Sequence, residues 1–161
     1  MTKLVGILNI TPDSFSDGGK FDGIENALAQ TQKLIKEGAQ MIDIGAESTR
    51  PGAKPVDIDD ELDRVIPLIQ KVRKFSYNSL ISVDTYKSKV AHEAIKAGAD
   101  IINDISGLRF DKLMVQIISE HNVPVVIMHM KGNPENMQDS PYYENIISSK
   151  STFIKRPFSA T

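Results

Sequence analysis

Polar side chains stand at the ends of successive apolar runs, in positions where a folded chain could use them for binding. The residues concerned are Asn9, Asp43, Asp84, Asn103 and His129. Carboxylates and amides suit the edge of a polar heterocycle, because an amide both donates and accepts hydrogen bonds. A neutral oxygen such as that of Asn9 could also hold a hard cation or a phosphate-bound water. For each residue taken alone, a structural role in a turn or a helix cap stays an open interpretation.

Two polar loops follow the first and second of these apolar runs. The first, NITPDSFSDGG (9–19), consists of turn residues around Phe15 and is longer than most strand-to-helix connections. The second, ESTRPGAKP (47–55), contains Thr49 and Arg50, a hydroxyl and a planar cation that suit a phosphate or a carboxylate. From composition alone, a surface turn and a functional loop are both open interpretations of each stretch.

Several familiar kinds of site are excluded by the residues present. The sequence has no cysteine, which rules out a disulfide framework and a thiolate zinc site and fits a reducing cytosol. His92, His121 and His129 are scattered without metal-ligand spacing, so a histidine-based transition-metal site is not expected. No Ser/His/Asp or Cys/His constellation is evident. The inventory favours binding of a polar heterocycle beside an anionic group, with catalysis by positioning and electrostatics.

The length and charge of the chain limit its class. With 161 residues and a formal net charge of -2, the sequence is typical of one globular domain and lacks the basic excess of nucleic-acid-binding proteins. No apolar run approaches the roughly 18 residues needed to cross a bilayer, and the N-terminal stretch has no signal-peptide pattern. We therefore expect a cytoplasmic protein that binds neither nucleic acid nor a membrane.

The elements that must position the polar residues alternate along the chain. Continuous apolar runs predict buried parallel strands. These runs are Leu4–Ile10, Met41–Ala46, Leu80–Thr85, Ile101–Ile105 and Val123–Met130. Apolar residues at helical spacing predict helices around 24–35, 62–72, 90–97 and 113–118. Asp57 and the acidic residues after it place negative charge at the N-terminus of the second helix.

An internal sequence similarity supports a repeated strand–helix unit. GAQMIDI (38–44) and GADIIND (98–104) share a glycine suited to a left-handed helix end, followed by a strand with a polar tip. Such repetition predicts a parallel sheet with right-handed crossovers. Neither nucleotide-loop fingerprint is present, and polar strand ends favour a (β/α)8 barrel over a doubly wound sheet. Asn103 and Asp104 fall on opposite faces of their strand, so only one of them should face the site.

Five sequence blocks, taken together, resemble those of one enzyme family. The blocks are GILNITPDSFSDGG, DIGAESTRPGA, SVDTYKSKVA, AGADIINDISG and MHMKGNPENMQ. In this order they are similar to blocks of bacterial dihydropteroate synthase, a pterin-binding TIM-barrel family, over about residues 4–143. Related methyltetrahydrofolate-binding methyltransferase domains share the barrel but lack the TPDSFSDGG block. The implied fold is α/β, a partial (β/α)8 TIM barrel with about five N-terminal βα units of a parallel barrel.

The resemblance implies a transferase of folate biosynthesis. Its substrates are p-aminobenzoate and (7,8-dihydropterin-6-yl)methyl diphosphate, and its products are dihydropteroate and diphosphate, with Mg2+ as cofactor. The substitution is SN1-like, so negative charge near the pterin methylene group favours the transition state. For the full-length enzyme, a homodimer is compatible with the family.

The resemblance also implies roles for the matching strand-end residues. Asn9 is matched to the family's contact with the metal and the diphosphate. Asp84 and Asn103 are matched to the residues that hydrogen-bond the pterin ring, and Asp84 is counted as catalytic. Met128 is matched to a methionine that packs near that ring.

The two polar loops receive roles by the same resemblance. Thr49 is matched to a substrate-binding residue, and Arg50 to one beside the diphosphate and the aminobenzoate. Asp13 is matched to a catalytic residue of a mobile loop that closes over the cationic intermediate.

The sequence departs from the family toward its C-terminus. The family continues with strands of the DPG[IF]GF, SRK and RVHD types, which carry further pterin and diphosphate ligands and have no match here. After Tyr143 the sequence shows no clear helical apolar pattern. We therefore expect residues 1–143 to form the N-terminal part of the barrel and 144–161 a divergent tail, in a C-terminally truncated, frameshifted or incomplete copy. Such a chain is expected to have negligible turnover alone, and the alternative function is a non-catalytic pterin-binding remnant.

Overall fold

The computed structural model describes residues 2–10, 19–48, 55–76, 78–130, 140 and 142–155. Within these residues, strands and helices alternate as the sequence predicts. The strands are β1 (Val5–Asn9), β2 (Met41–Gly45), β3 (Leu80–Asp84), β4 (Ile101–Asp104) and β5 (Val125–Ile127). The helices are α1 (Gly19–Lys36), α2 (Ile58–Phe75), α3 (Ser88–Ala97), α4 (Met114–His121) and α5 (Ile146–Lys155). Each predicted strand and helix is confirmed, and α5 is an addition.

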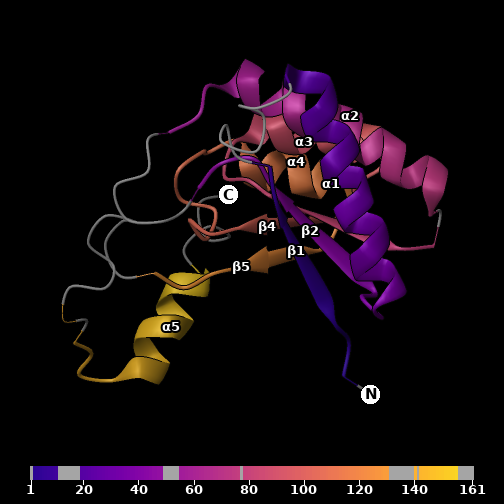
Figure 1. Cartoon of the computed structure of the whole chain (residues 1–161). Coiled ribbons are helices and arrows are strands. Elements are labelled where there is room, and N and C mark those ends of the chain that lie inside the picture. The colour runs from indigo at the N-terminus through magenta and orange to yellow at the C-terminus, as the bar shows by residue number, and fades with distance from the viewer. Residues whose placement is uncertain are drawn as a thin grey trace.

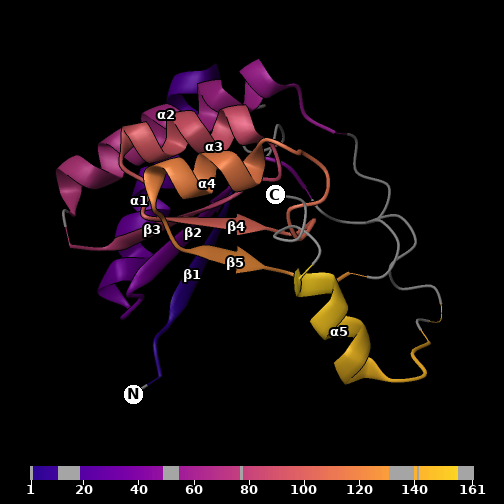
Figure 2. The same ribbon diagram turned by 180° about the vertical axis from the view of Figure 1, so that it is seen from behind.

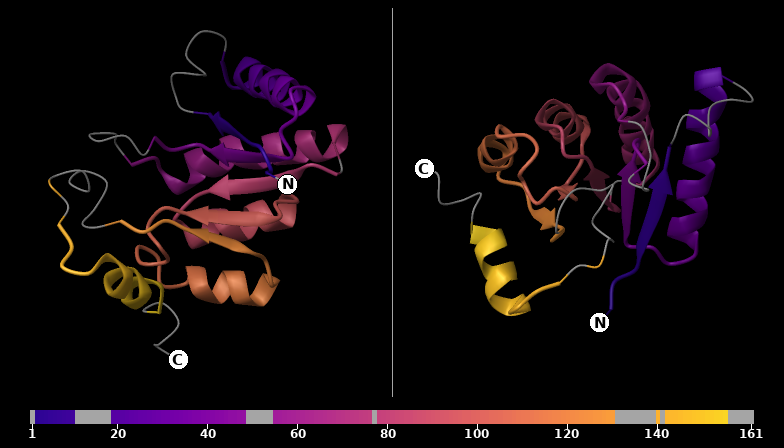
Figure 3. Two further views of the ribbon diagram at one scale, coloured as in Figure 1. Left: turned by 90° about the horizontal axis from the view of Figure 1, so that it is seen from below. Right: turned by 90° about the vertical axis from the view of Figure 1, so that its left-hand side faces the viewer.

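The sheet has the strand order of a barrel wall. Its five strands are all parallel and lie in the order β1-β2-β3-β4-β5. A doubly wound sheet would reverse its strand order at a switch point, and no reversal occurs here. Successive crossovers of one hand place α1–α4 on the same side of the sheet, as Figures 1 and 2 show from opposite directions. In the right panel of Figure 3, these helices form an arc outside a curved sheet.

The hydrophobic core lies between the sheet and this arc of helices. Ile42, Ile44, Ile81 and Ile102 point from the strands into the core and are completely buried. The facing side chains of α2 are Val65, Leu68, Ile69 and Val72. Asp57 is the N-cap of this helix, its carboxylate accepts the Asp59 N–H at 3.0 Å, and acidic residues follow in the first turn. The predicted charge pattern of its N-terminus is confirmed.

The two predicted glycine helix ends are also confirmed. Gly38 and Gly98 have φ angles of +106° and +117°, a left-handed conformation that glycine adopts without a Cβ clash. Gly98 ends α3, and the amide N–H groups of Gly98 and Ala99 return to the carbonyl groups of Ile95 and Ala94. Each glycine therefore turns the chain from a helix toward the strand that follows it.

Helix α5 lies apart from the arc, beyond the ends of β4 and β5 (Figures 1 and 2). Its sequence shows no clear helical pattern because it packs one half-buried aromatic side chain against the fold rather than an apolar stripe. Phe153 packs over Gly107, whereas Ile146, Ile147 and Ile154 are at least half exposed. The periodicity that reveals α1–α4 needs a buried face, and α5 has almost none. No helix among the described residues has the length and apolar character to cross a bilayer.

Candidate functional site

Three of the predicted site residues lie side by side at the C-terminal ends of the strands. The strand register pairs Asn9 with Gly45, Gly45 with Asp84, and Asp84 with Asn103. Neighbours in register project to the same face of a sheet, so these side chains share the concave face opposite α1–α4. A Cβ atom at Gly45 would lie 3.4 Å from Asn9 Oδ1 and 3.6 Å from Asp84 Oδ2. The missing side chain at Gly45 thus leaves room for Asn9 and Asp84 to approach each other.

Two residues earlier along β2 and β3, a second layer of polar side chains lies on the same concave face. Asp43 is paired in register with Ser82, and its Oδ2 atom accepts a hydrogen bond of 3.0 Å from Asn103 Nδ2. This bond orients the Asn103 amide with its oxygen turned away from Asp43. The other Asp43 oxygen, Oδ1, and the Ser82 hydroxyl are buried without a hydrogen-bond partner in the described part of the chain. Buried polar atoms without a partner are rare in folded proteins, so these two atoms, which lie on the same face of neighbouring strands, could take part in hydrogen bonds with a ligand or a water.

Asp43 is the site residue that the sequence analysis missed. It was recognised as a strand-end polar residue but was not assigned to the site. The internal sequence similarity could have predicted it, because GAQMIDI and GADIIND place Asp43 at the position that corresponds to Asn103. Equivalent positions of a β/α repeat face the same way, so Asp43 should accompany Asn103 into the site.

The pKa of Asp84 is raised from 3.8 to about 7. Burial of its carboxyl group is the main cause, and the negative charges of Asp43 and Glu61 act in the same direction. A carboxyl group that titrates near neutral pH responds strongly to its ligand. Donor N–H groups of a heterocycle favour the ionised form, which then supplies negative charge beside the ring.

Asp104 lies on the opposite face of β4, as predicted. It is completely buried, and its two oxygens accept the backbone N–H groups of Ser106 at 2.7 Å and Leu108 at 3.1 Å. Burial raises the pKa of Asp104 although these bonds oppose the shift. Asp104 therefore shapes the turn after β4, while Asn103 faces the site.

Asp84 does not cap the helix that follows it, which was an open interpretation of its sequence. Helix α3 starts at Ser88, and the Ser88 N–H donates to Asp111 Oδ2 at 2.8 Å. The Lys87 N–H donates to Thr85 Oγ1 at 3.2 Å. Because other residues satisfy the helix start, the Asp84 carboxyl group stays available on the concave face.

Met128 and His129 follow β5 and differ in their surroundings. Met128 is half-buried, and its N–H donates to the Asp104 carbonyl oxygen at 3.2 Å. The His129 ring lies 4.6 Å from the Phe153 ring and 5.5 Å from the Tyr143 ring, measured between centroids. His129 thus packs among aromatic side chains, in keeping with its structural interpretation.

Asp13, Thr49 and Arg50 lie outside the described residues. Their proposed roles in the two polar loops stay predictions.

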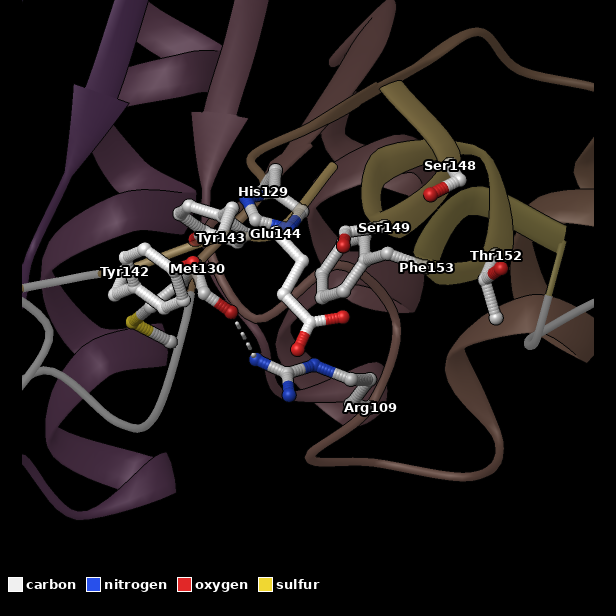
Figure 4. Close-up of a pocket in the computed structure, with 10 residues that line it drawn as sticks. All are labelled: Arg109, His129, Met130, Tyr142, Tyr143, Glu144, Ser148, Ser149, Thr152 and Phe153. Carbon is white, nitrogen blue, oxygen red and sulfur yellow. Dashed lines mark hydrogen bonds between the residues drawn. The ribbon is translucent and has the colours of Figure 1, made fainter. Parts of the chain in front are cut away.

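A separate cavity of about 660 Å³ lies between α5, the loop after β4 and the segment after β5. Figure 4 shows its lining residues, Arg109, His129, Met130, Tyr142, Tyr143, Glu144, Ser148, Ser149, Thr152 and Phe153. The Arg109 guanidinium group lies over the Phe153 ring at 4.7 Å, and its Nε–H donates to the Ser106 carbonyl oxygen. These contacts anchor α5 to the loop after β4. Asn9, Asp84 and Asn103 do not line this cavity, so the candidate site is assigned to the strand ends.

Two of the three histidines, which are far apart in the sequence, contact each other in the folded chain. His121 Nε2 of α4 lies 2.9 Å from His92 Nδ1 of α3, a contact between helices that sequence spacing could not reveal. Among the described residues, however, no group of three or more His, Asp or Glu side chains is arranged to hold a metal ion. At the strand ends, Asn9 is an exposed residue whose amide oxygen lies on the side of Gly45. Mg2+ commonly keeps several waters and binds through few protein oxygens plus substrate phosphates, so this donor fits an ion carried by a phosphorylated substrate.

Comparison with known proteins agrees with this geometry. The family described as "Pterin binding enzyme" matches residues 5–160 of the sequence. The chain belongs to this family. Among its relatives, the dihydropteroate synthase of Bacillus subtilis is 56% identical over 128 residues, which cover 80% of this chain and 45% of the relative. The dihydropteroate synthase of Synechocystis is 44% identical over 153 residues, 95% of this chain and 53% of the relative.

Solved structures of the pterin-binding family share the fold. The dihydropteroate synthase of Clostridium difficile, crystallised in the presence of pteroic acid, superposes with a TM-score of 0.86 at 43% identity. That match covers 98% of this chain and 57% of the other. The Yersinia pestis enzyme, in complex with a sulfonamide drug, gives a TM-score of 0.85 at 42% identity, over 96% of this chain and 56% of the other. The predicted fold class, five βα units of a parallel TIM barrel, is confirmed, and the chain spans about half the length of the curated relatives it matches.

Proposed function

We propose that the protein carries the pterin-binding part of a dihydropteroate synthase site. In the reaction, the amine nitrogen of p-aminobenzoate bonds to the methylene carbon of (7,8-dihydropterin-6-yl)methyl diphosphate. The bond from that carbon to the diphosphate oxygen breaks, and the amine loses a proton. The observation that carries this proposal is the adjacent pair of Asp84 and Asn103, in register on neighbouring strands. A relative crystallised with pteroic acid and another with 4-aminobenzoic acid support the substrate class.

Asp84 and Asn103 divide the recognition of the pterin ring. The Asp84 carboxylate accepts ring and amino N–H groups, and the oriented Asn103 amide meets the remaining polar edge. As diphosphate leaves, positive charge develops on the pterin and its methylene group. The ionised Asp84 stabilises that charge at close range, in a partly buried site where electrostatic interactions are stronger than in water.

Asn9 is the proposed protein ligand toward Mg2+ and the diphosphate group. When bound, Mg2+ neutralises the charge of the leaving diphosphate. Asn9 lies beside Asp84 across Gly45, so a metal ion or diphosphate held by its amide oxygen would lie next to a pterin bound by Asp84. Arg50 is proposed to bind the diphosphate and the aminobenzoate end.

Further proposals follow from the family. Thr49 contacts substrate, Met128 packs near the pterin ring, and Asp13 belongs to a loop that closes over the cationic intermediate. A role in folate biosynthesis and a cytoplasmic location are also proposed, and a sequence without cysteine is compatible with a reducing compartment. A homodimer is proposed for a full-length enzyme of this kind.

A second candidate function is a pterin-binding polypeptide without turnover. Ile7 and Val126, apolar residues on the concave face, are 68% and 46% exposed, so the described sheet forms one wall of a site. One wall can bind part of a substrate without completing the transition-state environment. We expect the polypeptide of residues 1–161 to belong to this second class.

The two candidates are separated by measuring binding and turnover on the same preparation. Binding of 6-hydroxymethylpterin is followed by its fluorescence, and dihydropteroate formation is assayed with both substrates and Mg2+. We expect saturable pterin binding and no product. Product formation would overturn the non-catalytic candidate for this chain. A folded chain that does not bind the pterin would overturn both candidates.

A further inference from the structure

A largely buried lysine follows Asp84 by three residues, and its ammonium group is fully hydrogen-bonded. Lys87 Nζ donates to Glu47 Oε2 at 2.6 Å, to Glu61 Oε2 at 2.5 Å and to the Val56 carbonyl oxygen at 2.8 Å. The side chains of Lys87, Glu47 and Glu61 are only 12%, 13% and 2% exposed. An ammonium group has three N–H donors, and each of them is used here.

Glu47 completes the cluster with two further bonds. Its Oε1 atom accepts the Tyr86 hydroxyl at 2.6 Å, and its Oε2 atom accepts the Val56 N–H at 2.9 Å. Burial alone would raise the pKa of Glu47, but the hydrogen bonds from Lys87 and Tyr86 outweigh it and hold the pKa below its usual value. Burial would lower the pKa of Lys87, and its bonds to Glu47 and Glu61 reverse that effect. The bridge is therefore ionic at neutral pH.

The cluster joins two points of the chain that flank one loop. Glu47 follows β2 closely, and Val56 lies just before α2. Between them runs the stretch that contains Thr49 and Arg50. Glu47 and Val56 are bonded to each other directly, and Lys87 binds both of them. Glu61, in the first turn of α2, fixes the ammonium group to a rigid element.

We propose that Lys87 is a positioning residue that sets where the 48–55 loop leaves and rejoins the fold. Lys87 thereby holds Glu47 and Val56, the two flanks of the stretch that contains Thr49 and Arg50, and we expect the substrate binding proposed for these two residues to depend on it. This consequence for ligand binding rests on the proposed function, whereas the ordering of the flanks does not. Holding groups near their working geometry lowers the entropic cost of binding an anion.

The first test compares Lys87→Met with Lys89→Met in the ligand-free chain. Lys89 is a matched control two residues further along the chain, in the first turn of α3, because its ion pair with Asp59 at 3.0 Å is exposed and does not involve the loop. Hydrogen–deuterium exchange is measured for peptides covering 47–56 and, as an internal reference, for β3 and β4. We expect at least tenfold faster exchange within 47–56 in Lys87→Met, unchanged exchange in β3 and β4, and no change in Lys89→Met. Unchanged exchange within 47–56 would overturn the proposal.

A second variant covers the case in which two buried carboxylates without their cation unfold the protein. The double variant Lys87→Met/Glu61→Gln removes one buried charge together with the bridge, and Glu47 keeps its bonds to Tyr86 and Val56. We expect the same local increase in exchange. If both variants instead lose protection in β3 and β4 as much as in 47–56, Lys87 is a general stability residue and the proposal is wrong.

The ligand measurement separates this proposal from the proposed function. Binding of inorganic diphosphate with Mg2+ and binding of 6-hydroxymethylpterin are titrated in the same variants. We expect about tenfold weaker diphosphate binding in Lys87→Met and less than a twofold change in pterin binding. Equal losses of both ligands would contradict a role through the loop. A wild-type chain that binds neither ligand overturns the proposed function, while the exchange measurement still decides the role of Lys87.

Discussion

At the scale of single residues, the site depends on how Asp43, Asp84 and Asn103 share charge and hydrogen bonds. Asp43 orients the Asn103 amide and also adds to the raised pKa of Asp84. Neither effect follows from the residue types alone, because both require that β2, β3 and β4 lie in a particular register. Asp84 and Asn103 lie side by side, Asp43 is hydrogen-bonded to Asn103, and their roles as pterin ligands stay predictions.

Asp84 makes folding stability depend on pH. Its pKa is about 7 in the folded chain against an ordinary value of 3.8, so the folded state binds a proton more tightly than the unfolded state. The stability contribution of Asp84 is therefore lost as pH rises from about 4 to about 7. We expect Asp84→Asn to stabilise the protein at pH 8 by on the order of 1 kcal/mol, limited by the partial exposure of the site. The gain should vanish near pH 4 in urea unfolding, and a gain independent of pH would contradict the assignment.

Asp43 is expected to act on Asp84 through its charge. The variant Asp43→Asn keeps an oxygen that can accept the Asn103 Nδ2–H bond but removes the negative charge. We expect the pKa of Asp84 to fall, as followed by the carbon chemical shift of its carboxyl group in a pH titration. Asp59→Asn, which removes an exposed carboxylate on α2, is the control and should leave the Asp84 titration unchanged. If the pKa of Asp84 were the same in Asp43→Asn as in the wild-type chain, the charges of the two residues would be uncoupled.

At the scale of elements, the sequence predicted the strands and α1–α4 because each has a face that packs into the core. The fully buried strands appear as continuous apolar runs, and Gly38 and Gly98 mark helix ends. Helix α5 was not predicted because it packs the single side chain of Phe153 against the fold rather than an apolar stripe. The Lys87 cluster was not predicted for another reason. Its partners Glu47 and Glu61 are 40 and 26 residues away in sequence, and no local periodicity connects them.

The junction between α3 and β4 depends on Gly98. Arg73 of α2 donates through Nε–H to the Gly98 carbonyl oxygen at 2.7 Å and through Nη1–H to the Ser79 carbonyl oxygen at 2.7 Å. It also pairs with Asp100. A Cβ atom at Gly98 would lie 2.9 Å from Arg73 Cγ, at a φ angle of +117°.

We expect Gly98→Ala to destabilise the protein by about 2–3 kcal/mol, because it combines backbone strain with displacement of Arg73. Gly38→Ala is the matched comparison. It has the same kind of φ angle, but its Cβ atom would have no neighbour nearer than 3.9 Å. It should cost only about 1 kcal/mol. Urea unfolding measures both, and an equal loss in the two variants would show that the Arg73 contacts do not matter.

At the scale of the whole molecule, the described chain is one wall of a barrel with its functional groups gathered at one end. The barrel architecture was predictable because polar residues end successive strands, and the observed strand order agrees with it. Asp13, Thr49 and Arg50 lie in loops outside the described residues, and their roles in the site stay predictions. The turn residues of these loops carry no periodic signal from which a conformation could be argued.

The central claim is that the strand-end pair Asp84 and Asn103 binds a pterin ring. The most direct test is the dissociation constant of 6-hydroxymethylpterin between pH 5 and 9, for the wild-type chain and for Asp84→Asn. The account predicts wild-type binding that strengthens as Asp84 ionises near pH 7. It predicts at least tenfold weaker binding at pH 8, without this pH dependence, in Asp84→Asn, corresponding to about 1.4 kcal/mol or more. Equal affinities and identical pH profiles for the two proteins would contradict it.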